Sequence, residues 1–232
     1  DVTPMRDSRP YYTGFLKLGE ISMYLDQVQD VSEDWGYLLR LGILLQSIIL
    51  GALVIAMPVV GRWRELFKNQ RGTLGVILYF ACLGLGFMLV EIFLIQKLVF
   101  ILTNPIYSVS IVITSMLIIS AVGNLTSRFI SKSRTVIVRV ACVGILASMA
   151  FYIFGLSPVL NAFRDQSMFI RVLISIAVIA PSAFFLGMPF PNGLDGLTEN
   201  RPRLLPWAWG MNGGLSVTGS ALAWIFSVAY GF

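Results

Sequence analysis

One glutamate lies in the middle of a strongly apolar run of this chain, FMLVEIFLIQK from Phe87 to Lys97. An ionised carboxylate at the centre of a membrane helix costs about 2.5–3.5 kcal/mol, so Glu91 is expected to face protein or a water-filled cavity instead of lipid. At helical spacing, Glu91 shares its face with Gly84 and Met88. Lys97 lies about 120° around the helix, near the membrane boundary, and its long side chain is expected to extend to the surface instead of pairing with Glu91.

The turn TNP at residues 103–105 predicts that the segments before and after it pair as a hairpin, in which Glu91 comes level with about residue 117. Three hydroxyl side chains bracket that level, namely Thr114, Ser115 and Ser120. Such groups form hydrogen bonds between membrane helices. Two interpretations of Glu91 stay open: a neutral or hydrogen-bonded packing residue, or a site for a proton or a cationic ligand.

A second candidate is the stretch PSAFFLGMPFPNGLDG, residues 181–196, in which prolines and glycines interrupt an apolar run. Proline lacks a backbone donor and clashes with the preceding turn, so the helix is predicted to kink near Pro181 and to stop around Pro189. The helix-breaking residues are Pro181, Gly187, Pro189 and Pro191. Freed carbonyls beside Asn192 and Asp195 would coordinate a ligand as broken helices do in transporters. A plain exit of the chain from the membrane is the favoured interpretation.

The third candidate is PWAWGMNGGLSVTGSALA, residues 206–223. Trp207 and Trp209 are expected at the membrane interface, and most of the small residues that follow suit close helix packing. Asn212 is the polar exception. It is expected to meet Asn124 at similar depth, so that an inner polar cluster forms from Asn124, Asn192, Asp195 and Asn212.

The composition sets the class of protein that must position these residues. Of 232 residues, 56% are hydrophobic, 12% are charged and none is histidine, which indicates an integral membrane protein. Cys82 and Cys142 both fall in apolar runs, where cysteine acts as a small apolar residue. We therefore expect no catalytic set, no metal site and no cofactor in this chain. The net charge of +5 does not indicate nucleic-acid binding, because the basic residues gather in short loops between apolar runs.

The predicted fold is an all-α, polytopic transmembrane helical bundle. A span needs about 20 apolar helical residues, and about six such runs are present. They cover residues 38–60, 74–102, 106–130, 135–157, 168–190 and 207–230. Residues 1–36 are predicted to form a short water-exposed N-terminal segment without the features of a signal peptide, and residues 37–232 the transmembrane domain.

Two loops, at residues 61–72 and 127–139, each carry four basic residues, whereas the loops between them carry few. By the positive-inside rule, both loops are expected on the cytoplasmic side of a bacterial inner membrane. Counting spans then places the N-terminal segment outside the cytoplasm. The loop from residue 191 to 206 is expected inside.

Three stretches together resemble a known family: residues 80–125 (FACLGLGFMLVEIFLIQKLVFILTNPIYSVSIVITSMLIISAVGNL), residues 186–194 (LGMPFPNGL) and residues 206–223. The chain resembles the C-terminal membrane region of bacterial spermidine-synthase-like proteins, in which membrane helices are fused to an aminopropyltransferase-like or methyltransferase-like domain. The opening TPMRDSRPYYTGFLK is similar to the TDDRPFFF segment that follows the soluble domain there. The resemblance implies that the family positions are Glu91, Gln96, Pro105, Gly187, Pro189, Pro191, Trp207, Trp209, Asn212 and Gly213.

The chain departs from the family in two ways. Residues 5–10, MRDSRP, replace one acid of the family's TDDRP pattern. No strand followed by a glycine-rich turn and a helix is present, so no S-adenosyl ligand is expected to bind this chain. The expected orientation also places residue 1 outside the cytoplasm, whereas S-adenosyl ligands are cytoplasmic.

Three functions are compatible with these features. The favoured hypothesis is a non-catalytic scaffold or accessory subunit of a larger membrane assembly, with lipid and other membrane subunits as partners. A transporter-like module for a cation or polyamine, with Glu91 as the acidic site, is the second hypothesis. The third is a membrane anchor for an S-adenosyl-dependent enzyme whose soluble domain is fused or associated.

Overall fold

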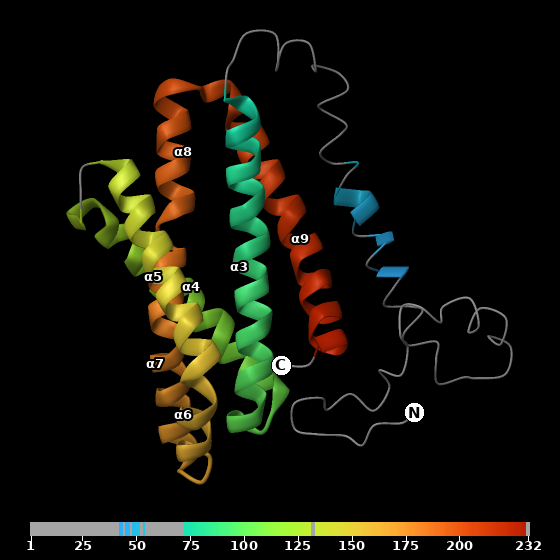
Figure 1. Cartoon of the computed structure of the whole chain (residues 1–232), viewed down its shortest axis with the longest axis vertical. Helices are drawn as coiled ribbons and strands as arrows, with labels where there is room; N and C mark the ends of the chain where they lie inside the picture. Colours follow the sequence, from blue (N-terminus) through green and yellow to red (C-terminus); the bar gives the residue numbers. More distant parts are fainter. Residues whose placement is uncertain are drawn as a thin grey trace, which may run out of the picture.

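The computed structural model describes residues 42–43, 45–46, 48–51, 53, 72–130 and 133–230, and all regular structure in them is helical (Figure 1). The predicted all-α class is confirmed for this part of the chain. From residue 73 onward the elements are α3 (Thr73–Leu102), α4 (Pro105–Ile130), α5 (Arg134–Phe154), α6 (Leu156–Phe163), α7 (Met168–Leu186), α8 (Pro189–Asn200), the 3-10 turn η2 (Pro202–Leu204) and α9 (Leu205–Tyr230).

Among the described residues, four helical segments are long and apolar enough to cross a membrane, which supports the predicted membrane-spanning class. They are Thr73–Leu102, Pro105–Phe129, Arg134–Phe154 and Met168–Asn200, the last of which joins α7 and α8. The predicted count of six spans is not confirmed. α9 covers the predicted span 207–230 but is not one of the four. The predicted span 38–60 lies largely outside the described residues, and the predicted segment 1–36 lies wholly outside them.

The end of the fifth predicted span differs from the expectation. α7 passes through Pro181 and ends at Leu186, and α8 begins at Pro189. Proline is compatible with the first turn of a helix, because the N–H groups there have no intrahelical acceptor. Pro189 therefore starts a helix. The expected loop over residues 191–206 is wrong, since α8 and η2 occupy most of it.

The helices pack as two neighbouring groups. α9 lies beside α3, while α4 and α5 both pack on α7 (Figure 1). The buried positions along one side of α3 are spaced by three, four or seven residues, as expected for a helix packed on one face. These positions include Phe80, Gly84, Glu91, Leu94, Leu98 and Ile101. Glu91 is thus part of the packed face of α3, as the sequence predicts.

One end of the bundle brings together the start of α3, the start of α5 and the end of α8. Arg134 forms an ion pair with Glu199, and the Arg201 guanidinium lies close to Gly72. The two predicted cytoplasmic segments that the structure describes, those around Arg134 and Arg201, are therefore at the same end. Most of the basic loop at 61–72 lies outside the described residues.

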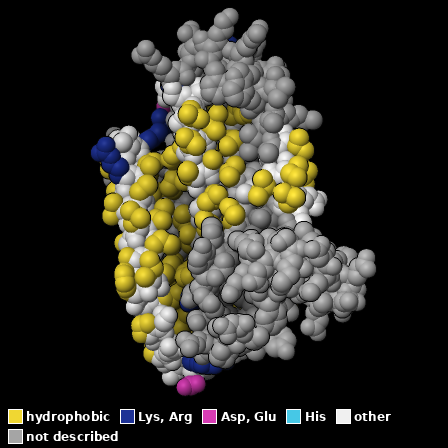
Figure 2. All heavy atoms as spheres, turned by 45° about the vertical axis from the view of Figure 1, so that its right-hand side comes forward, with side chains coloured by type: hydrophobic (Ala, Val, Ile, Leu, Met, Phe, Trp, Pro, Cys, Tyr) yellow, Lys and Arg dark blue, Asp and Glu magenta, His cyan; other side chains and the backbone are white. Residues whose placement is uncertain are grey.

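The outward faces of the helices are apolar. Figure 2 shows hydrophobic side chains covering most of the described surface on this side, with blue basic groups confined to its edges. Large exposed apolar side chains on α4 and α5 include Leu117, Leu125, Phe129, Leu146 and Ile153. Surfaces of this kind are compatible with a lipid bilayer.

Candidate functional site

The break between α7 and α8 is the irregular point around which the candidate site is built. The Gly187 amide donates to the Ala183 carbonyl (3.1 Å), and the Met188 amide donates to the Phe185 carbonyl (3.3 Å). Pro191 has no N–H group, so the Gly187 carbonyl lacks the donor that a continuous helix would supply four residues later. The break therefore removes one backbone hydrogen bond that a continuous helix would have.

Close helix packing explains why a glycine stands at this break. A Cβ added at Gly187 would lie 2.1 Å from the Ser120 carbonyl oxygen of α4. The contact is reciprocal, because a Cβ added at Gly123 of α4 would lie 2.0 Å from the Phe184 carbonyl oxygen of α7. The two glycines allow the backbones of α4 and α7 to touch at this crossing.

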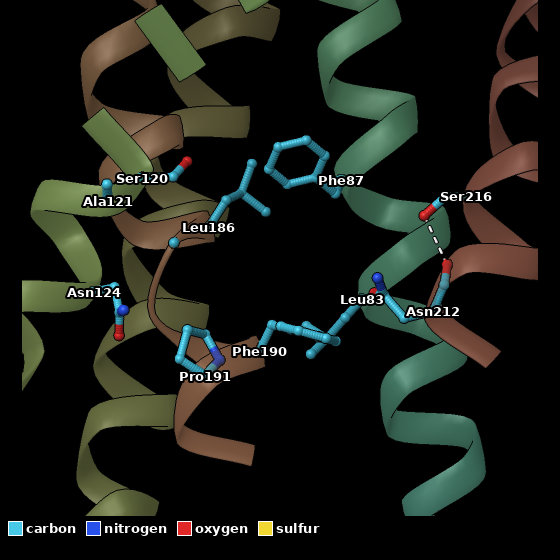
Figure 3. Close-up of a pocket in the computed structure, with 11 residues that line it drawn as sticks. Leu83, Phe87, Ser120, Ala121, Asn124, Leu186, Phe190, Pro191, Asn212 and Ser216 are labelled. Carbon is cyan, nitrogen blue, oxygen red and sulfur yellow. Dashed lines mark hydrogen bonds between the residues drawn. The ribbon is translucent and has the colours of Figure 1, made fainter. Parts of the chain in front are cut away.

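A cavity of about 340 Å³ opens beside the break. Its walls come from α3, α4, the end of α7, α8 and α9 (Figure 3). The lining residues are Leu83, Phe87, Ser120, Ala121, Asn124, Leu186, Gly187, Phe190, Pro191, Asn212 and Ser216. Such a volume, with mostly apolar walls and a few polar groups, is typical of a small-molecule site.

Two carboxamide side chains lie on opposite sides of this cavity. Asn124 comes from α4 and Asn212 from α9 (Figure 3). Within the described part of the chain, neither side-chain amide has a hydrogen bond to another residue. Each amide offers two donors and an acceptor. The pair can therefore hold a polar ligand from both sides.

The two serine hydroxyls of the cavity are already used in the packing of helices. Ser120 donates to the Ala183 carbonyl of α7 (3.0 Å). Ser216 donates to the Asn212 carbonyl (2.7 Å) and to the Gly84 carbonyl of α3 (3.3 Å). These bonds fix the walls, so the amides are the groups left to meet a ligand.

An aromatic cluster holds the start of α8 against the cavity. The Phe190 ring stacks edge-on with Phe80 and Trp209, with centroid separations of 5.5 and 5.0 Å. The Tyr79 hydroxyl donates to the Pro189 carbonyl (2.7 Å). Edge-to-face pairs of this kind add about 0.5–1.5 kcal/mol beyond the burial of the rings. α8 is thereby fixed at its first turn.

Glu91 is buried, with 9% of its surface exposed, but it does not line the cavity. Phe87, one turn earlier on the same face of α3, does. The hairpin register also differs from the prediction, because Ser108 donates to the Ile95 carbonyl (2.7 Å). Ser108 and Ile95 therefore lie at the same level of the hairpin. Four residues further from the turn on each helix, Glu91 comes level with the apolar Val112 instead of residue 117.

The three hydroxyl candidates are not brought together around Glu91. Thr114 is exposed, Ser115 is buried, and Ser120 bonds to α7. The reason is the helical period, which places consecutive residues about 100° apart, so residues 114, 115 and 120 cannot all face α3.

The predicted inner polar cluster is assembled only in part. Asn124 and Asn212 share the cavity, as the similar depth of the two residues suggested. Asn192 turns to the other side of α8, where its amide donates to the Ser127 hydroxyl (3.2 Å) and the Met188 carbonyl (2.8 Å). Asp195 is exposed. Of the predicted interface anchors, Trp207 is half-buried and Trp209 is exposed near the start of α9.

Several lining residues were missed by the sequence. Ser216, four residues after Asn212, follows from helical spacing and was within reach of that reasoning. Phe190 gave no such signal, because the packing of its ring depends on where α8 turns after the break. No group of three potential metal ligands occurs in the described part of the chain.

Comparison with family models, with curated proteins and with solved structures finds no match for this chain.

Proposed function

We propose that this chain is a transporter-like membrane module that holds a small polar solute in the cavity beside the α7–α8 break. The observation that supports this proposal most directly is the pair of amides, Asn124 and Asn212, facing one space at a helix break. Transporter sites are typically built in this way, from a discontinuous helix and a few polar side chains at membrane depth. The proposal develops the second of the three sequence-based hypotheses.

The lining narrows the class of solute. None of the described residues that line the cavity is acidic or basic, and Phe87 and Phe190 add aromatic surface. An uncharged solute with hydrogen-bonding groups suits such a site. A single amine cation also suits it, held by amide and carbonyl oxygens and by the face of an aromatic ring. A polyamine with several charges has less support, because Glu91 lies outside the lining.

Cysteine labelling tests whether solutes reach this cavity. In a background with Cys82 and Cys142 changed to alanine, we expect Asn124→Cys and Asn212→Cys to react with a membrane-impermeant maleimide, because a solute site must be hydrated. Leu117→Cys is the matched control on α4, since Leu117 is 64% exposed on the apolar outer face. A thiol in lipid does not form the reactive thiolate.

The readout is the mass of the labelled protein in proteoliposomes, with reagent added from each side in turn. Labelling of the cavity cysteines from both sides, with Leu117→Cys spared, is the expected result. Cavity cysteines that resist the reagent from both sides would mean that the space is sealed, and the transport proposal would then fail.

A non-catalytic scaffold or accessory subunit is the second candidate. Its support is the large apolar outer surface of α4 and α5, including the 89% exposed Phe129, which is available to a neighbouring membrane subunit as well as to lipid. We expect co-purification from the native membrane in mild detergent to retain a stoichiometric partner, identified by mass spectrometry. A chain that runs alone, with Phe129→Ala behaving identically, would count against this role.

The partner found in that experiment also tests the anchor hypothesis. A partner with an S-adenosyl-binding domain would support the role that the family resemblance implies. The location in an inner membrane and the extracytoplasmic N-terminal segment are proposals that rest on the basic loops of the sequence.

A further inference from the structure

Glu91 is a buried carboxyl that the proposed solute site does not use. It lies near the middle of α3, on the buried stripe between Gly84 and Leu98, and 91% of its surface is covered. Within the described part of the chain, no side chain or backbone group forms a hydrogen bond or an ion pair with it. Its carboxyl oxygens are not wholly enclosed, because the Arg171 Nε is the only fully covered side-chain polar atom without a hydrogen bond in the described part of the chain. An acid with no protein partner in a membrane helix is a functional candidate by default.

Among the described residues, no charged group faces Glu91 from the helices packed against α3. α9 has no charged residue between Leu205 and Ala223, and α6 has none between Leu156 and Phe163. On the other three packed helices the titratable groups lie elsewhere along the bundle: Tyr107 and Arg128 at the two ends of α4, Arg171 near the start of α7, and Asp195 and Glu199 on α8.

Arg171, which contacts α3, and Lys97, which lies on α3 itself, are both badly placed for an ion pair with Glu91. Arg171 donates to the Ile101 carbonyl (2.9 Å), which is ten residues or about 15 Å further along α3. Lys97 lies six residues further along, about 120° around the helix, and has another interaction. Of the remaining titratable groups, Tyr152 of α5 contacts Phe93 and bonds to Val178 and Ser182, while Tyr79 bonds to Pro189.

We propose that Glu91 is a proton-binding site inside the membrane, separate from the solute cavity. Because the described residues place no cation or hydrogen-bond donor beside it, the neutral carboxylic acid is the form that this apolar setting favours. The proton leaves to water when water reaches the carboxyl, and the carboxylate takes it back when water is expelled. Phe87 lines the cavity and lies one turn before Glu91 on the same face of α3, so a displaced Phe87 ring would open a route for water from the cavity.

Carbodiimide labelling provides the first test. The hydrophobic reagent dicyclohexylcarbodiimide takes up the proton of a neutral carboxylic acid and forms a covalent adduct on its oxygen, whereas a carboxylate in water is a poor substrate. With the full chain in nanodiscs, we expect mass spectrometry to find the adduct at Glu91, more at mildly acidic than at alkaline pH. The exposed Glu199 is the internal control and is expected to stay unmodified.

Infrared spectroscopy provides a second readout that does not depend on access of the reagent. We expect the unaltered protein to show the carbonyl stretch of a protonated carboxyl group, which shifts in heavy water and is absent in Glu91→Gln. Glu199→Gln, as the control, is expected to keep it. A spectrum in which Glu91 contributes only carboxylate bands at all pH values would overturn the proposal. This result does not depend on whether the carbodiimide reaches Glu91. The inference does not depend on the cavity holding a solute, so either proposal can fail alone.

Discussion

Gly84→Ala is expected to destabilise the bundle strongly, because it forces α3 and α9 apart. A Cβ at Gly84 would lie 2.1 Å from the Asn212 carbonyl oxygen and 2.9 Å from the Ser216 hydroxyl. Both are parts of the same turn of α9, joined by the Ser216–Asn212 hydrogen bond. A backbone oxygen cannot move without its helix. We expect a loss of about 1–3 kcal/mol in the free energy of unfolding, the usual cost of overpacking.

Gly86→Ala is the matched control, two residues away on the same helix. Nothing lies within 4 Å of a Cβ added at Gly86, so that alanine meets open space. Since alanine is the better helix former, the control is expected to be neutral or slightly stabilising. Unfolding of both variants in detergent, followed by circular dichroism, gives the comparison. Equal stability of the two would show that α9 does not pack on α3 through Gly84.

The second large effect is expected at the crossing of α4 and α7. Gly187→Ala and Gly123→Ala each place a Cβ about 2 Å from a backbone carbonyl oxygen of the facing helix. Each variant is expected to lose about 1–3 kcal/mol of stability. Because both act on one crossing, the double variant should lose less than the sum of the two single losses.

Gly196→Ala on α8 is the control for this pair, since the nearest atom to its added Cβ is the flexible Arg134 Cδ at 3.7 Å. The crossing also forms one wall of the cavity. Gly187→Ala is therefore expected to change the rate at which Asn212→Cys reacts with maleimide, whereas Gly196→Ala leaves that rate unchanged. Additive losses of stability, or an unchanged labelling rate in Gly187→Ala, would contradict the proposed packing.

The helical spans were predicted well where the signal is carried by local composition. Three apolar runs expected at residues 74–102, 106–130 and 135–157 appear as helical segments with similar bounds, and the run expected at 168–190 begins as predicted but continues to Asn200. Burial of Glu91 followed from the same reasoning, because an acid in an apolar run avoids lipid regardless of the fold. The helix formed by residues 189–200 was not predicted. Pro189 and Pro191 were read as the end of a helix, but proline is equally compatible with the first turn of the next one.

The candidate site was less predictable, because its residues come from five elements far apart in the sequence. Equal depth suggested that Asn124 and Asn212 meet, and both line the cavity. The same reasoning failed for Ser120, which faces α7, and for Asn192, which faces Ser127. Depth fixes a residue along the helix axis, whereas the rotation of each helix about its axis is set by side-chain and glycine contacts between helices.

By itself, the sequence determined that this protein forms helices long and apolar enough to cross a membrane and that Glu91 lies on a buried face. Those properties depend on the local balance between apolar side chains and backbone polarity in a medium without water. Only the tertiary structure showed that Glu91 lies outside the lining of the cavity, whereas Phe87, one turn earlier on α3, is part of it. That separation depends on which helix faces touch, and the glycines at positions 84, 123 and 187 set those contacts.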